Sequence, residues 1–130
     1  MNKTGLGILL LALLVSMAAC KKDPGTGGLA SIKGKVYAFD YNTYGELVDS
    51  GYIASEKVYI SYGSHTTVDD DINTSYTGEY MFEWLQKGDY TVYVLSKCDT
   101  CPLGTMHIEQ KVTIDSRKQV VNLPDFIIKK

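Results

Sequence analysis

The sequence predicts an all-β protein, a seven-stranded antiparallel β-sandwich that follows an N-terminal export segment. Several stretches alternate apolar and polar residues with a period of two, which is typical of half-buried strands. Residues that favour turns, mainly glycine, asparagine and aspartate, separate these stretches at short intervals. After residue 20, apolar residues do not recur at the helical spacing. About seven strands in roughly 100 residues fit the size of a β-sandwich.

The first nineteen residues are expected to be a signal peptide rather than part of the domain. Lys3 gives a basic start, and residues 6–19 are almost wholly apolar. This apolar run is shorter than the roughly 20 residues that a helix needs to span a bilayer. Cys20 follows two alanines directly, and this junction resembles the lipobox of bacterial lipoproteins. The resemblance implies that Cys20 carries lipid and becomes the mature N-terminus.

Residues 20–28 are expected to be a flexible tether, because they are polar and rich in glycine. The Lys-Lys-Asp run after Cys20 resembles the short signal of lipoproteins that are displayed outside the outer membrane. We therefore expect a domain of residues 29–130 that lipid attaches to the outer membrane, exposed at the cell surface, with the periplasmic face as the alternative. A net charge of −2 without a basic stripe indicates no nucleic-acid partner.

The first half of the domain predicts two clear strands. Residues 32–39 place Ile32, Val36 and Ala38 on one face, and residues 57–62 turn Val58 and Ile60 inward. Residues 40–55 are expected to form a long connection with a short strand at 46–48. Residues 66–76 must hold another strand, although three consecutive aspartates interrupt its alternation.

Residues 77–96 are expected to form the centre of the core. Tyr80, Phe82 and Trp84 alternate with polar residues, and a second alternating run follows from Tyr90. Residues 86–89 contain glycine and predict the turn of a β-hairpin. Three aromatic side chains and two valines on one face make this hairpin the expected centre of the core.

The last third predicts a loop and two strands. Residues 97–104 contain two cysteines and a proline and are expected to be a loop. Residues 107–114 alternate again, and residues 119–128 form a final strand that is broken at Pro124, which lacks an N–H donor.

Four stretches together resemble one family template: IKGKVYA at 32–38, EKVYISYG at 56–63, TSYTGEYMFEWLQKGDYTVYV at 74–94, and VTIDSRKQVVNLPDFIIKK at 112–130. The pattern Tyr80-x-Phe82-x-x-Leu85 is part of its most specific segment. The chain resembles the carboxypeptidase regulatory-like, transthyretin-like domains, which belong to the carbohydrate-binding-like β-sandwiches. The resemblance implies a seven-stranded sandwich without an active site, used for stabilisation, adhesion or recognition.

Cys98 and Cys101 leave three alternatives open. A redox CxxC motif works from a helix N-terminus, which the sequence does not predict here. A zinc site needs four ligands, and these cysteines with His107 supply three. A disulfide that closes a short loop is favoured, since removing Cys20 leaves an even pair in an exported protein.

Asp69, Asp71 and Asn73 are weak candidates for a calcium site, because hard oxygen ligands suit this ion. Their spacing does not fit the EF-hand, since Thr74 occupies the glycine position and Tyr80 the glutamate position. An acidic, solvated turn is the simpler interpretation, and we expect no metal and no cofactor.

Exposed tyrosines suggest a glycan-binding surface, because aromatic rings stack on the apolar faces of sugars. Three candidates lie on outward strand faces and three in the long connection: Tyr37, Tyr59, Tyr93, Tyr41, Tyr44 and Tyr52. The two histidines lie outside any nucleophile motif, so we expect no enzyme. The sequence therefore predicts a carbohydrate-binding module. The alternative is a structural subunit accessory to an outer-membrane protein, pairing through residues 32–39 or the last strand.

Overall fold

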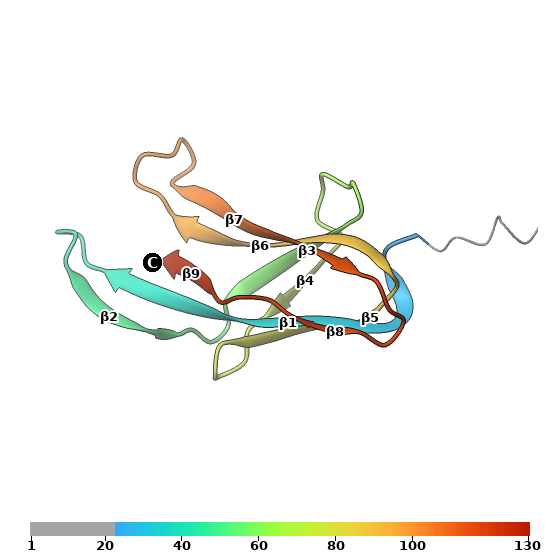
Figure 1. The fold of residues 1–130 in the computed structure, drawn as a ribbon. Helices are drawn as coiled ribbons and strands as arrows, with labels where there is room; N and C mark the ends of the chain where they lie inside the picture. Colours follow the sequence, from blue (N-terminus) through green and yellow to red (C-terminus); the bar gives the residue numbers. More distant parts are fainter. Residues whose placement is uncertain (1–22) are drawn as a thin grey trace, which may run out of the picture.

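The computed structural model describes residues 23–130, which contain nine β-strands in two sheets (Figure 1). The predicted signal peptide and Cys20 lie outside the described residues. Within the described part, no helix is long and apolar enough to cross a membrane. The strands are β1 (Thr26–Tyr41), β2 (Leu47–Tyr52), β3 (Lys57–Tyr62), β4 (Asp70–Asn73), β5 (Glu79–Leu85), β6 (Gly88–Lys97), β7 (Thr105–Ile114), β8 (Val120–Asn122) and β9 (Phe126–Lys129).

The long strand β1 is the centre of the first sheet. On one edge it pairs antiparallel with β5 along its first half and with β2 along its second half. On the other edge it pairs in parallel with β8 and then with β9. The second sheet has the antiparallel order β4-β3-β6-β7. The prediction of an all-β sandwich is therefore confirmed.

The prediction of seven antiparallel strands is wrong in its details. The expected long connection contains the six-residue strand β2, which pairs with β1 in a hairpin. The final strand is split around Pro124 into β8 and β9, and both run parallel to β1. Residues 32–39 belong to a strand that is paired on both edges. They cannot serve as the open edge that the sequence suggested for a partner.

The predicted β-hairpin at residues 77–96 is also wrong. Strand β5 pairs with β1, whereas β6 pairs with β3 and β7, so the link at residues 86–87 joins the two sheets instead of closing a hairpin. Trp84 has a φ of +59° just before this link. This left-handed residue breaks the alternation, so Leu85 is buried and Trp84 is 63% exposed. Trp84 is thus outside the core in which the sequence placed it.

The core lies between the two sheets and is built mainly from aliphatic side chains of β1, β3 and β6 with aromatic rings from β5, β6 and β9. The Tyr80 ring extends over Gly34 on β1, where an added Cβ would lie 2.5 Å from the Tyr80 hydroxyl oxygen. Only glycine leaves room for this ring. Within the described residues the buried Tyr80 hydroxyl has no hydrogen-bond partner, and burial raises the pKa of this phenol.

A second buried tyrosine fixes the point at which the chain enters the sandwich. The Tyr90 hydroxyl accepts a hydrogen bond from the Gly25 N–H (2.9 Å) and donates one to the Gln86 carbonyl (2.6 Å). Pro24 packs on Gly88, where a Cβ would lie 2.4 Å from the proline Cγ. Gly25 is buried and β1 begins at Thr26, so the packed chain starts inside the segment predicted as a tether.

The two buried tyrosines give a matched test of stability. Tyr90→Phe leaves the Gly25 N–H and the Gln86 carbonyl without partners, so we expect a loss of about 1–3 kcal/mol. Tyr80→Phe removes an unpaired buried hydroxyl and should be neutral or stabilising. Urea unfolding of both variants measures the difference. A Tyr80→Phe variant that is as unstable as Tyr90→Phe would contradict this account.

Candidate functional site

Two loops and the end of a strand lie at the end of the sandwich opposite the point where the chain enters (Figure 1). They are the β1–β2 turn, the β6–β7 loop and the end of β9. A cleft of about 490 Å³ lies between them. Its walls are formed by Tyr41, Asn42, Thr43, Tyr44, Gly45, Lys97, Asp99, Lys129 and Lys130.

The β1–β2 turn holds Tyr44 in a defined position. The Asn42 side-chain oxygen accepts hydrogen bonds from the N–H groups of Tyr44 (2.9 Å) and Glu46 (3.0 Å). The Asn42 amide nitrogen donates to the Glu46 carboxylate (3.0 Å), and Gly45 supplies the left-handed residue with a φ of +78°. Asparagine at such a position mimics a backbone turn. The turn is thus held by its own contacts while Tyr44 is 87% exposed.

A disulfide constrains the opposite wall of the cleft. Cys98 and Cys101 are bonded, with their Cα atoms 5.4 Å apart, so the disulfide interpretation is confirmed. The Cys98 N–H donates to the Gly104 carbonyl (2.9 Å), and the Gly104 N–H donates to the Cys101 carbonyl (3.0 Å). These bonds close a small loop next to Lys97 and Asp99. Leu103 is at the outside of this loop and is 90% exposed.

The cleft is lined by more positive than negative charge. Lys97 lies 3.8 Å from Asp99, and the Lys129 ammonium lies 5.7 Å from the centre of the Tyr41 ring. Lys130 is paired with Glu56, a partly buried carboxylate outside the lining. Among the lining residues there are three lysines and one aspartate. Asp99 and Glu56 compensate two of these lysines, and Lys129 is the lining lysine for which residues 23–130 show no ion pair. Its ammonium group can donate to the oxygen atoms of a ligand.

Tyr59 and Tyr93 lie on the outer face of the second sheet and are not part of the cleft lining, although Tyr93 precedes Lys97 by four residues on β6. They are cross-strand partners with rings stacked at 4.9 Å, and His107 stacks against Tyr93 at 4.7 Å. Since Tyr59 and His107 come from the strands on either side of β6, they cover opposite faces of the Tyr93 ring. Tyr93 therefore has no free face on which a sugar could stack.

Tyr37 and Tyr52 form a separate pair on the outer face of the first sheet. Their rings meet edge to face at 5.2 Å, and the Lys35 ammonium lies 4.9 Å from the Tyr52 ring centre. The Tyr52 hydroxyl donates to Asp125 (2.8 Å), and this hydrogen bond raises the pKa of Tyr52. Tyr52 lies on β2, not in a loop. Of the six tyrosines selected from the sequence, only Tyr41 and Tyr44 line the cleft.

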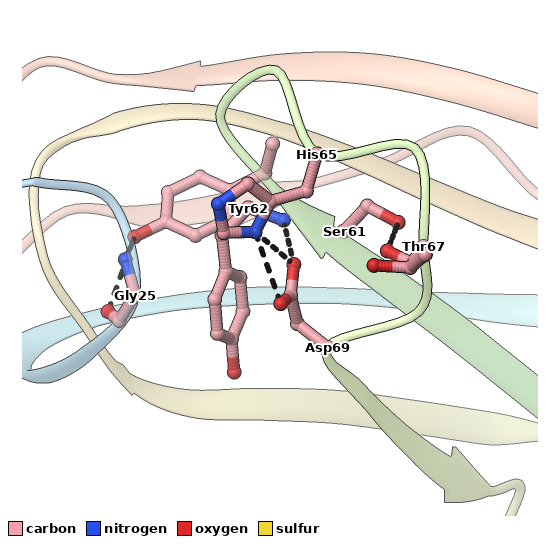
Figure 2. A network of polar contacts seen from close by, with 7 residues as sticks. Gly25, Ser61, Tyr62, His65, Thr67 and Asp69 are labelled. Atoms are coloured by element: carbon pink, nitrogen blue, oxygen red, sulfur yellow. Dashed lines mark hydrogen bonds and ion pairs between the residues drawn. The ribbon is translucent and has the colours of Figure 1, made fainter.

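The weak calcium candidates are not brought together as a set of free ligands. The Asp69 carboxylate accepts a hydrogen bond from the Tyr62 N–H (2.7 Å) and contacts His65 Nδ1 at 2.9 Å (Figure 2). The Asp71 carboxylate forms an ion pair with the Lys57 ammonium group (3.3 Å). Asn73 on β4 lies opposite Lys57 on β3 in the antiparallel register. Residues 23–130 contain no group of three or more His, Cys, Asp or Glu side chains arranged to hold a metal.

Sequence reasoning missed Trp84, which lines a second depression of about 190 Å³. A signal for its exposure was present in the pattern Tyr80-x-Phe82-x-x-Leu85. The spacing of these apolar positions changes from two to three after Phe82, so Trp84 and Leu85 cannot both follow the alternation of β5. The long-range pairing of Leu85 with Thr26 and Ala30 decides which of the two enters the core.

Comparison with known proteins identifies no family. No protein-family model matches the sequence, and no curated protein matches it. Among solved structures, the chain is similar to a putative carbohydrate binding protein from Pseudomonas aeruginosa, with 13% identity and a TM-score of 0.44. The match covers 90% of this chain and 96% of that one. At this level of similarity the match carries no argument for the function of this chain.

The Asp69 contacts predict a loss of stability in acid. The Tyr62 N–H, and after it His65, lowers the pKa of Asp69 below its ordinary value of 3.8. The folded state is thus stabilised at pH values above about 4, and this contribution is lost as the pH falls through the lowered pKa. The urea concentration at the midpoint of unfolding should decrease as the pH is lowered from 5 to 2. This decrease should be smaller for Asp69→Asn than for the wild type.

His65→Gln is the control for this experiment. This variant removes the His65 contact and keeps the hydrogen bond from the Tyr62 N–H, which is the largest cause of the lowered Asp69 pKa. It should therefore retain most of the pH dependence of stability. An Asp69→Asn variant with the same pH profile as the wild type would contradict the assignment.

Proposed function

We propose that this protein is a non-catalytic, lipid-anchored binding module of the cell envelope that binds carbohydrate in the cleft at the end of the sandwich. The observation that carries the proposal is Tyr44. Its ring is 87% exposed, its turn is held by the Asn42 hydrogen bonds, and it lines a cleft with polar walls. We also propose that the domain belongs to the transthyretin-like sandwiches that its sequence motifs resemble.

The chemistry of the cleft suits a sugar with acidic groups. An exposed aromatic ring packs against the apolar face of a pyranose, while side chains beside it bond the hydroxyl groups. Lys97, Lys129 and Lys130 are donors on the walls, and Asp99 is an acceptor. Ammonium groups bind carboxylates and sulfates more strongly than neutral hydroxyls. Uronic or sulfated glycans should therefore bind better than neutral ones of the same length.

The position of the cleft also supports a role in recognition at the envelope. The chain enters the sandwich at Pro24, and the sixteen residues of β1 run from this end to the cleft (Figure 1). Thr26 and Ala30 both pair with Leu85, so the extended part of β1 begins at Ala30. At about 3.3 Å per residue, the part from Ala30 to Tyr41 is roughly 40 Å long. Cys20 precedes Asp23 by three residues, a reach of about 10 Å. Lipid on Cys20 would hold the entry end near the membrane and turn the cleft away from it.

One observation favours a protein partner as the second candidate. Leu103 is 90% exposed on the disulfide loop beside the cleft, and a sugar has little use for an aliphatic side chain there. A protein partner can bury such a residue together with Tyr44, since apolar anchors dominate the energy of protein interfaces. This candidate corresponds to an accessory subunit of an outer-membrane protein.

A glycan array tests the proposal, with the exported protein carrying Cys20→Ser so that no lipid is attached. We expect binding to acidic oligosaccharides that falls about tenfold in Tyr44→Ala, a change of about 1.4 kcal/mol. Tyr76→Ala is the matched control, because Tyr76 is 97% exposed yet is not part of the cleft lining. Leu103→Ala should have no effect on glycan binding.

Two results would contradict the proposal. The first is the absence of binding to any glycan at high protein concentration. The second is glycan binding that Tyr44→Ala leaves unchanged. In the first case, a partner protein captured by crosslinking on intact cells, and lost in Leu103→Ala, would establish the second candidate.

A further inference from the structure

Strand β7 forms the longer of the two open edges of the second sheet. It has ten residues and pairs only with β6, so one of its edges has no neighbouring strand (Figure 1). The other outer strand of this sheet, β4, has four residues. An unpaired edge presents N–H and C=O groups to any chain that can pair with them, and proteins usually shorten, charge or cover such edges. A regular edge of ten residues is therefore a candidate interaction surface.

The register with β6 shows which backbone groups of β7 point to the open edge. The Cys98 N–H donates to the Gly104 carbonyl (2.9 Å), and the pairing then continues without a shift along the whole of β7. Bonded and non-bonded pairs alternate in an antiparallel ladder, so the even-numbered residues of β7 bond β6. The odd-numbered residues direct their N–H and C=O groups outward, and they are Thr105, His107, Glu109, Lys111 and Thr113. Within residues 23–130, no strand or loop backbone pairs with these groups.

The side chains along this edge are complementary to those of a second copy. The odd-numbered residues are all exposed, and Glu109 precedes Lys111 by two positions. In the described part of the chain, neither residue is in an ion pair. When two copies of β7 are placed antiparallel with Gln110 opposite Gln110, Glu109 of each copy lies opposite Lys111 of the other. Opposite charges in directly opposed positions stabilise a pair of strands.

The charges select this register over its neighbours. Outward-pointing groups of one copy must meet outward-pointing groups of the other, so odd-numbered residues must lie opposite odd-numbered residues. The nearest allowed shift in one direction puts Glu109 opposite Glu109, and the nearest in the other direction puts Lys111 opposite Lys111. Like charges in directly opposed positions destabilise a pair of strands. The register centred on Gln110 avoids both.

The core-facing side of β7 also continues across such a pair. Ile108 and Val112 pack against the core but are only half-buried, and Met106 is 46% exposed. In the register centred on Gln110, Ile108 of each copy lies opposite Val112 of the other, so apolar surface that is open in one copy becomes covered. The Gln110 side-chain amide donates to the Pro124 carbonyl (3.0 Å), which ties this point of β7 to the first sheet.

We propose that β7 is an interface at which two copies of this chain pair antiparallel about Gln110, so that their second sheets become one continuous sheet. The open backbone groups supply the hydrogen bonds, Glu109 and Lys111 select the register, and the half-buried apolar side chains supply the surface that is covered. The glycan cleft shares no lining residue with β7. The pairing therefore does not rest on glycan binding and stands if that proposal fails.

Antiparallel pairing also sets the relative orientation of the two copies. Ile114 at the end of β7 pairs with Gly88, on which Pro24 packs, so β7 ends where the chain enters the sandwich. The two entry points then lie at opposite ends of the joined sheet. Copies that lipid holds upright on one membrane, as proposed above, point the same way and do not have this orientation. Copies on facing membranes, and copies free of lipid, can adopt it.

Sedimentation equilibrium of the exported Cys20→Ser protein, from micromolar to millimolar concentration, tests the pairing. The expected result is a monomer that becomes a dimer as the concentration rises. Glu109→Lys or Lys111→Glu alone sets like charges opposite each other twice, and each should weaken the dimer about tenfold or more. Glu83→Lys and Lys118→Glu are the matched controls, because they make the same changes of net charge at exposed residues outside β7. The controls should leave the affinity unchanged.

A mixture of the two single β7 variants distinguishes this interface from any other. Glu109→Lys has two lysines at these positions and Lys111→Glu has two glutamates, so each variant repels itself and attracts the other. An equimolar mixture should therefore form heterodimers. The double variant, Glu109→Lys with Lys111→Glu, exchanges the two charges and should dimerise like the wild type.

Hydrogen exchange adds a measurement at single amides. The N–H groups of His107, Glu109 and Lys111 are open in one copy, so they should exchange quickly in dilute protein and become protected as the concentration rises. The N–H groups of Ile108 and Val112 already bond β6 and should change less.

Four outcomes would overturn the proposal. The first is a protein that stays monomeric up to millimolar concentration. The second is a dimer whose affinity neither Glu109→Lys nor Lys111→Glu changes. The third is a mixture of these two variants that stays monomeric. The fourth is a dimer that the two control variants weaken as much as the β7 variants do, because such a dimer would depend on net charge alone.

Discussion

The pairing of β1 on both of its edges is the constraint on which the rest of the structure depends. Between Ser31 and Phe39 it bonds β5 and then β2 on one side, and β8 and then β9 on the other. The Leu123 N–H also donates to the Lys33 carbonyl (2.8 Å), and the Lys130 N–H donates to that of Phe39 (2.9 Å). One strand thus joins the beginning, the middle and the end of the chain. Its inward side chains, with those of β3 and β6, form the core.

This arrangement separates two ends with different chemistry. Near Thr26, Tyr90 and Pro24 hold the entering chain, and the link after Trp84 crosses between the sheets beside them. Near Tyr41, a turn and a disulfide loop enclose a cleft with three lysines in its walls. The first end thus fixes the entering chain, and the second places the exposed Tyr44 ring beside lysine side chains.

Local pattern in the sequence was sufficient for the class of fold, for most strands and for the disulfide. Alternation in residues 57–62 and the short spacing of Cys98 and Cys101 are local signals, and the structure agrees with both. The prediction of a hairpin at residues 77–96 failed because alternation indicates on which face of a strand a residue lies. It does not indicate which strand lies beside it. Which of Trp84 and Leu85 is buried was likewise decided by Thr26 and Ala30, more than fifty positions away. Tyr44 was correctly placed in a turn, yet the lysines around it come from the end of β6 and the end of the chain, which no local pattern joins.

Native-state hydrogen exchange tests the central role of β1 most directly. If its pairing on both edges holds the two ends together, the bonded amides of residues 32–38 should exchange only through global unfolding, with the highest protection in the protein. Amides of β4 and β7, at the edges of the second sheet, should open at lower free energy. Exchange of the β1 amides through a smaller opening, while those of β6 remain protected, would show that the second sheet is the stable unit and would contradict the account.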